Sequence, residues 1–209
     1  MKKKLRILIL RHGMTKGNSE KRYIGKRSQE PLSKEGERLL RENASGYPSS
    51  MYLFVSPSLR AVNTARIIYP RLFSRRIVIP VFDEMDFGIF EGKNYKDLSD
   101  NAAYRQWVDG GCLGMIPGGE DMESFKERVR EGFSIVIDTI EKEHKELSLI
   151  HITEAEDFSP KRRLSEVTDA VIVAHGGTIM ALLSSFLDQD YFSFDAACGE
   201  GYILTVTVD

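Results

Sequence analysis

Two histidines of the sequence occupy the same local pattern, directly after a short apolar run and directly before glycine. The first is His12, which follows Arg11 at the end of the run Leu5–Leu10. The second is His175, which follows the run Val171–Ala174. Such runs are typical of buried strands, and open α/β sheets bind their ligands beyond the carboxyl ends of the strands. A cation and two imidazoles at those ends therefore predict a site for an anion.

Phosphoryl transfer is the chemistry that these residue types suit. The transferring group carries spread negative charge and needs several fixed cations, and the planar fork of arginine matches phosphate oxygens. Arg60, in the first turn of a helix expected at Ser56–Tyr69, is a second candidate cation beside Arg11. His12 can act as a nucleophile if a backbone carbonyl holds its other ring nitrogen. The acidic cluster Asp83–Asp86 offers a carboxyl group that burial could keep protonated, as the leaving oxygen requires.

The elements that must position these residues alternate along the chain. Apolar runs predict strands at Leu5–Leu10, Met51–Val55, Ile77–Phe82, Val171–Ala174 and Tyr202–Val208. Helical spacing of apolar residues predicts helices at Ser33–Leu40, Ser56–Tyr69, Asp121–Ile140 and Gly177–Leu187. We expect Ser56 to cap the second helix and Pro57 to occupy its first turn. The alternation predicts one α/β domain over residues 1–209, a three-layer α/β/α sandwich around a mainly parallel central sheet.

Two segments do not fit this alternation. Gly110–Gly119 is too rich in glycine for a regular element and is predicted to be a mobile loop, either a connection or a lid over the substrate. Leu147–Asp169 contains a short apolar patch and is predicted to add a strand or hairpin outside the main sheet. Its basic run Lys161–Arg163 is expected to be a solvated face, with recognition of an anionic substrate as the alternative.

Composition excludes several classes of function. The chain has 209 residues, of which 42% are hydrophobic and 29% are charged, as in ordinary soluble domains. With 29 Lys and Arg against 31 Asp and Glu, the net charge is -2, so no nucleic-acid partner is expected. No apolar run approaches the roughly 20 residues of a membrane span, so no membrane partner is expected. Cys112 and Cys198 are expected to be free thiols in a reducing cytosol, which predicts a cytoplasmic protein.

Two tempting motifs fail on closer inspection. The stretch Gly88–Lys93 is similar to a P-loop, but it has one residue too few between its glycines and Asn94 stands where a magnesium-binding hydroxyl is needed. His151 lies near Glu154 and Glu156, yet no ligand-type spacing surrounds it. The sequence therefore predicts no metal site.

Five motifs in order carry a family resemblance. They are RHGMTKGN, PLSKEG, SPSLRAVNTA, DEMDFGIFEG and AHGG, which begin at Arg11, Pro31, Ser56, Asp83 and Ala174. In this order they resemble the histidine phosphatase superfamily, and the resemblance covers nearly the whole chain. It implies the phosphoglycerate-mutase-like fold.

The resemblance also implies roles for individual residues. It makes His12 the nucleophile that becomes phosphohistidine and Glu84 the proton donor. Thr15 and Gly25 would belong to the loop at the pocket. The residues that it implies for phosphate binding are Arg11, Arg60, His175 and Asn18. The family uses no metal for this step, so no cofactor is expected.

Within the superfamily, the stretch DFGIFEGKNYKDL and the segment Pro117–Val129 look like the broad bacterial phosphatase branch, which includes α-ribazole phosphatases. Phosphoglycerate mutases carry an NERxYG-type stretch where this chain has DEMDFG. The sequence thus predicts a phosphatase for a small-molecule phosphate ester, such as α-ribazole 5'-phosphate or a sugar or glycerate phosphate. A phosphoglycerate mutase-type phosphotransferase and a phosphate-binding module without turnover stay as alternatives, and a homodimer is left open.

Overall fold

The computed structural model describes residues 3–143, 145–162 and 167–209. Its strands are β1 Lys3–Arg11, β2 Ser50–Val55, β3 Ile77–Val78, β4 Ile150–Phe158, β5 Thr168–Ala174 and β6 Gly201–Val208. Its α-helices are α1 Lys16–Ser19, α2 Lys34–Glu42, α3 Leu59–Ile68, α4 Ala102–Asp109, α5 Met122–Glu141 and α6 Gly176–Phe186.

The strands form one sheet in the order β3-β2-β5-β1-β6-β4. The pairs β1–β5, β2–β5 and β2–β3 are parallel, whereas β6 runs antiparallel to both β1 and β4. In this register Arg11 lies opposite Ala174, and Val55 lies opposite Val173. The carboxyl ends of β1, β2 and β5 therefore meet at one edge of the sheet.

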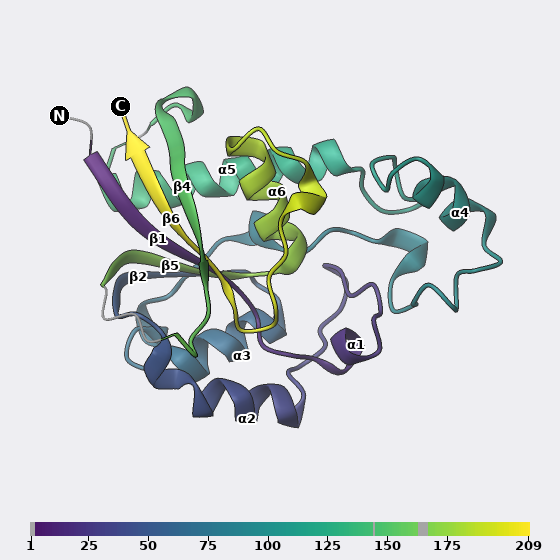
Figure 1. Cartoon of the computed structure of the whole chain (residues 1–209), viewed down its shortest axis with the longest axis horizontal. Helices are drawn as coiled ribbons and strands as arrows, with labels where there is room; N and C mark the ends of the chain where they lie inside the picture. The colour runs from purple at the N-terminus through teal and green to yellow at the C-terminus, as the bar shows by residue number, and fades with distance from the viewer. Residues whose placement is uncertain (1–2, 144, 163–166) are drawn as a thin grey trace.

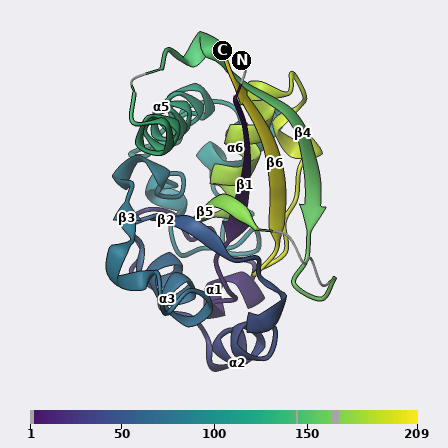
Figure 2. The same cartoon turned by 90° about the vertical axis from the view of Figure 1, so that its left-hand side faces the viewer.

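Helices cover both faces of the sheet. Helices α2 and α3 lie against one face and α5 and α6 against the other, while α4 stands away from the sheet (Figures 1 and 2). In β1, Ile7 and Ile9 belong to the core on the α5 side, and Leu8 and Leu10 to the core on the opposite side. All four side chains are fully buried, as expected for a strand covered on both faces. The predicted α/β/α sandwich with a mainly parallel centre is confirmed.

Two expected strands differ in the structure. The strand expected at Ile77–Phe82 ends after Val78, and a 3-10 turn follows at Pro80–Phe82, because proline offers no N–H to a ladder. The segment Leu147–Asp169 was expected to add a strand or hairpin outside the main sheet, but it supplies β4, the edge strand of that sheet. Strand β4 pairs with β6, with an irregularity in the register between Ile152 and Glu154. That part of the prediction was wrong, since the outer edge of β6 was free to accept a further strand.

Helix α4 was not anticipated from the sequence. The side chain of Asn101 caps it by accepting a hydrogen bond from Tyr104 N at 3.0 Å, and Trp107 is its buried residue. The following segment, residues 110–119, forms no helix or strand, as expected. It is nevertheless anchored, because Ile116 is fully buried and Ile89 N donates to Pro117 O at 3.1 Å.

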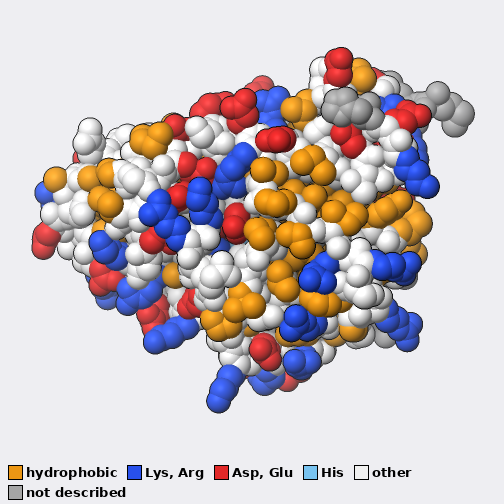
Figure 3. Space-filling view, turned by 180° about the vertical axis from the view of Figure 1, so that it is seen from behind, with side chains coloured by type: hydrophobic (Ala, Val, Ile, Leu, Met, Phe, Trp, Pro, Cys, Tyr) orange, Lys and Arg blue, Asp and Glu red, His pale blue; other side chains and the backbone are white. Residues whose placement is uncertain are grey.

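The basic run Lys161–Arg163 was expected to be a solvated face. Lys161 and Arg162 are exposed, and Arg163 lies outside the described residues. The rear face carries a gathering of hydrophobic side chains among scattered charges (Figure 3). The homodimer left open by the sequence stays a prediction.

Among the described residues, no helix combines the length and apolarity needed to cross a membrane.

Candidate functional site

The two histidines meet at the carboxyl edge of the sheet. His12 follows β1 and His175 follows β5, and their ring centroids are 5.2 Å apart in an edge-on arrangement. Both side chains are almost fully buried, at 3% and 0% exposure. The parallel pairing of β1 and β5 produces this encounter, since His12 N donates to Ala174 O at 3.0 Å.

The His12 ring is held in one tautomer. Its Nδ1 lies 2.7 Å from Gly13 O, and its Nε2 accepts a hydrogen bond from Arg60 Nε at 3.2 Å. Because arginine nitrogens only donate, the lone pair is on Nε2 and the ring proton is on Nδ1. Burial, together with the charges of Arg60 and Arg11, lowers the pKa of His12 well below 6.5. The ring is therefore a neutral imidazole with its reactive nitrogen facing a cation.

Arg60 is a fully buried guanidinium in the first turn of α3. Its Nη1 donates to Ser28 O at 3.1 Å, and its Nη2 donates to Ile24 O and Gly25 O at 3.2 Å. The carbonyls of this loop satisfy one side of the fork and leave Nε directed at His12. Burying a cation is costly without partners or an anionic ligand, so this placement favours an anion site.

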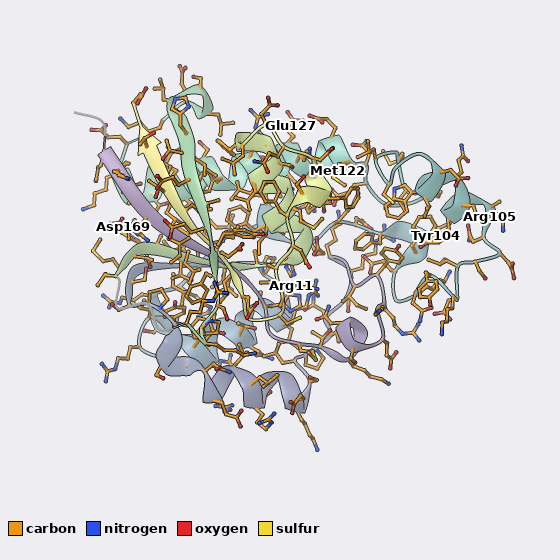
Figure 4. The ribbon with its side chains drawn as sticks, in the orientation of Figure 1. Arg11, Tyr104, Arg105, Met122, Glu127 and Asp169 are labelled. Atoms are coloured by element: carbon orange, nitrogen blue, oxygen red, sulfur yellow. The ribbon has the colours of Figure 1, made fainter. Side chains whose placement is uncertain are left out.

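Arg11 closes the end of β1 and lies near the centre of the molecule (Figure 4). Its Nη1 donates to Ala196 O at 2.7 Å, in the loop before β6. Its Nε is buried and makes no hydrogen bond within the described part of the chain. An unpaired buried donor is costly, and an anion would satisfy it.

His175 forms a polar group that sequence reasoning missed. Its Nε2 lies 2.7 Å from Ser56 Oγ and 3.3 Å from Ser58 Oγ, and the Ser56 hydroxyl donates to Asp83 Oδ1 at 3.3 Å. This places the ring proton on Nε2 and leaves Nδ1 buried, with no partner among the described atoms. Burial and the charge of Arg60 lower the pKa of His175 well below 6.5.

The capping role expected for Ser56 was wrong. Ser58 is the N-cap residue of α3, and Ser56 lies two residues earlier, at the end of β2. There its hydroxyl meets the His175 ring, because β2 and β5 are parallel neighbours. Only that pairing, which the local sequence does not encode, brings the two residues together.

Glu84 lies beside the same edge and is 8% exposed. Its Oε1 accepts from Met85 N at 2.9 Å, and its Oε2 accepts from Gly177 N at 3.1 Å, at the start of α6. Burial raises the pKa of Glu84, while these amides and Arg60 oppose the rise. A Cβ at position 177 would overlap the Glu84 carboxylate, so any residue other than glycine would force that side chain to move. The result is a buried carboxyl group suited to proton transfer.

Arg128, on α5, is a second residue that sequence reasoning missed. Its guanidinium donates to the carbonyl oxygens of Val81, Asp83 and Glu84 at 2.8, 2.7 and 3.0 Å, and it pairs with Glu120 at 2.6 Å. These bonds fix the turn that carries Glu84. Arg128 lies in the segment Pro117–Val129 that carries the branch resemblance, but an arginine is ordinary on the polar face of a helix, so its type gave it no predicted role.

Asn18 is placed differently from the other predicted residues. It ends the first turn of α1, and its Oδ1 accepts hydrogen bonds from Thr15 N and Thr15 Oγ1, both at 3.1 Å. Cys198 Sγ also lies 3.6 Å from this oxygen. The carbonyl is thus occupied by local structure, and only the amide N–H groups are left for a ligand. Its phosphate-binding role stays a prediction.

The structure thus brings five of the predicted residues together. They are Arg11, His12, Arg60, Glu84 and His175. Within the described residues, no group of three or more His, Cys, Asp or Glu side chains is placed to hold a metal ion. The arrangement offers a neutral imidazole, two guanidinium donors and a buried carboxyl group beyond the carboxyl ends of the same strands.

Comparison with known protein families gives a clear match. The sequence profile of the histidine phosphatase superfamily (branch 1) matches residues 7–153. Among curated proteins, the "Probable phosphoglycerate mutase GpmB" of Cronobacter sakazakii is 32% identical over 138 residues, 64% of each chain. The protein of the same name from Klebsiella pneumoniae is 33% identical over 130 residues, 60% of each chain. The chain spans a little under two thirds of the length of these relatives.

Solved structures share the fold. A phosphoglycerate mutase from Thermus thermophilus aligns with a TM-score of 0.60 and 28% identity, over 89% of this chain and 86% of that one. An alpha-ribazole phosphatase from Shigella flexneri aligns with a TM-score of 0.67 and 23% identity, over 93% and 87%. The second likeness concerns the fold alone.

Proposed function

This chain belongs to branch 1 of the histidine phosphatase superfamily, and on that premise we propose that it is a metal-independent phosphatase acting through a phosphohistidine on His12. Its substrate would be a small-molecule phosphate monoester. The observation that carries the proposal is the state of the His12 ring. Gly13 O fixes the proton on Nδ1, and the Nε2 lone pair accepts a hydrogen bond from Arg60 Nε at 3.2 Å, a donor that a bound phosphate would engage instead.

The reaction has two steps. In the first, His12 Nε2 forms a bond to phosphorus while the bond to the ester oxygen breaks, and Glu84 gives its proton to that oxygen. In the second, water attacks phosphorus, Glu84 takes a proton from it, and the phosphorus–nitrogen bond breaks. Arg11, Arg60 and a protonated His175 stabilise the charge on the phosphoryl oxygens in both steps.

A phosphate dianion would raise the pKa of His175. In the free protein, burial and neighbouring arginines keep the ring neutral, and its Nδ1 has no partner among the described atoms. A bound dianion reverses the local charge and offers an acceptor for a second ring proton. Substrate binding would therefore be coupled to proton uptake.

Hydrolysis of an aryl phosphate in the presence of EDTA tests the proposal. The wild type is expected to release phosphate, and His12→Ala to lose that activity. Equal activity of the two proteins would overturn the role of His12. Loss of wild-type activity in EDTA, with recovery on adding a divalent metal, would overturn the metal-independent mechanism.

The role of Glu84 is tested by its dependence on the leaving group. Glu84→Gln is expected to lose about a hundredfold or more in first-step rate for alkyl phosphates, because their alkoxides need a proton. For p-nitrophenyl phosphate the first step should lose far less, because that leaving group departs without one. An equal loss for both substrates would assign the proton to another acid.

A mutase is the second candidate, favoured by the names of the curated relatives and of the Thermus thermophilus structure. It would return the phosphoryl group from His12 to a second hydroxyl of the bound substrate. Incubation with 3-phosphoglycerate and its bisphosphate separates the candidates. Rapid isomerisation without phosphate release would favour the mutase, and tight binding without any turnover would favour a binding module.

A further inference from the structure

A cavity of about 240 Å³ lies beside Glu84. Glu84 and Gly177 line it, and so does Met180 on α6. The carboxylate that would protonate the ester oxygen thus borders the cavity directly. A group attached to an ester oxygen that Glu84 protonates would have this space beside it.

Aromatic side chains from separate segments make up much of the wall. They are Tyr23, Phe87, Trp107, Tyr191 and Phe192. The Tyr23 ring centroid lies 5.1 Å from that of Phe87 and 5.9 Å from that of Trp107, and Tyr191 and Phe192 are 5.0 Å apart. Edge-on and tilted contacts of this kind are the ones that aromatic rings favour. A flat ring entering the cavity would extend the same pattern.

The cavity lacks a cation for an acidic substrate. Glu84 is the one acidic residue in the described lining, which contains no Lys or Arg. Nearby cations are engaged elsewhere: Arg128 pairs with Glu120, and Arg27 pairs with Asp86. Lys126 Nζ lies 5.9 Å from the centroid of the Tyr191 ring. A substrate carboxylate would lose its water here and face Glu84 without compensation.

We propose that this cavity binds the leaving group and selects phosphate esters of small, uncharged aromatic alcohols. The inference rests on the proposed function, since it assigns the alcohol half of the ester that His12 attacks. An apolar cavity of about 150 Å³ is enough to hold benzene, so this one has room for one ring or a compact fused pair. Glycerate and polyhydroxylated alcohols would lose the water around their polar groups here, and the apolar walls would offer those groups few hydrogen bonds in return.

Four substrates with similar alkoxide leaving groups test the selection: benzyl phosphate, methyl phosphate, glycerol 3-phosphate and 3-phosphoglycerate. Because the alcohols have comparable acidity, differences in kcat/KM report binding of the leaving group rather than bond cleavage. Benzyl phosphate is expected to exceed glycerol 3-phosphate by about tenfold or more, the scale of an apolar pocket contact. 3-Phosphoglycerate should be the poorest substrate.

Two variants alter the wall itself. Phe192→Ser changes a residue that is 59% exposed at the rim, so the fold should tolerate it. It is expected to lower the benzyl-to-methyl ratio of kcat/KM several-fold. Met180→Lys places a cation in the cavity and should raise the ratio for 3-phosphoglycerate over benzyl phosphate by about tenfold. Val108→Ser, on α4 outside the lining and 42% exposed, is the matched control and should leave every ratio unchanged.

Inhibition by inorganic phosphate shows that the phosphate site is intact in each variant. If the wild type hydrolyses all four esters equally and neither wall variant changes a ratio, the leaving-group inference is overturned while the proposed hydrolysis stands. If no ester is hydrolysed and no protein phosphate forms, the proposed function itself fails.

Discussion

The two buried histidines predict a loss of stability in mild acid. Burial lowers the pKa of His12 and of His175 well below the ordinary value of 6.5. Below pH 6.5 the unfolded chain therefore binds protons that the folded chain does not, so stability falls with the pH. Between pH 7.5 and 5.5 each histidine lowers the free energy of unfolding by up to about 1.4 kcal/mol, or about 2.7 kcal/mol for the pair.

Urea unfolding at the two pH values measures this effect, with circular dichroism and the emission of Trp107, the single tryptophan, as probes. Glu84 acts in the opposite direction, because its raised pKa adds stability that is lost as the pH rises. The comparison is therefore made between the wild type and the double variant His12→Gln, His175→Gln. Subtracting the pH dependence of the variant from that of the wild type cancels, to first order, the contribution of ionisable groups outside the two histidines.

Between pH 7.5 and 5.5, the free energy of unfolding of the double variant is expected to fall by about 2–3 kcal/mol less than that of the wild type. A difference below about 0.5 kcal/mol would refute the reasoning, because the histidines would then titrate in the folded protein as they do in the unfolded chain. A saturating anion in the site should also weaken the dependence in the wild type, since it stabilises the charged rings.

Three further perturbations test other parts of the site. Sulfate, a dianion across this pH range, should bind up to about tenfold more tightly per pH unit as the pH falls from 7.5 to 5.5, because its binding takes up a proton; calorimetry that finds constant affinity would contradict this. Gly177→Ala should displace the Glu84 carboxylate and lower kcat/KM for alkyl phosphates by about a hundredfold without abolishing sulfate binding. Normal turnover in that variant would show that Glu84 is not held by this contact. Arg128→Met should lower the free energy of unfolding by about 2–3 kcal/mol, because the carbonyl oxygens of the Glu84 turn and Glu120 lose a charged donor; an unchanged urea midpoint would contradict it.

Local patterns in the sequence were enough to predict the central layers of the fold. The stretches Ile7–Leu10 and Val171–Ala174 are continuously apolar because helices cover both faces of their strands. The edge strand β4 was harder to predict. Its Ile150 and Ile152 are buried, but Glu154 and Glu156 face outward, so half of the strand resembles a charged loop.

The site could be predicted only where one short motif carries the residue. His12 and His175 each follow a strand directly, so their position at the sheet edge follows from the topology alone. Ser56 and Arg128 reach the site through neighbours distant in sequence, His175 and the Glu84 turn. Such contacts depend on strand order and helix packing, which short motifs do not specify.

The most direct test of the central claim is detection of a covalent phosphate on His12. Glu84→Gln should accumulate it with p-nitrophenyl phosphate, because that ester still reacts while the water step lacks its base. We predict up to one phosphate per chain, stable in alkali and lost in acid, on the peptide that contains His12, and none in the same variant carrying His12→Ala. Phosphate release without any protein-bound phosphate, or a label on another residue, would contradict the account.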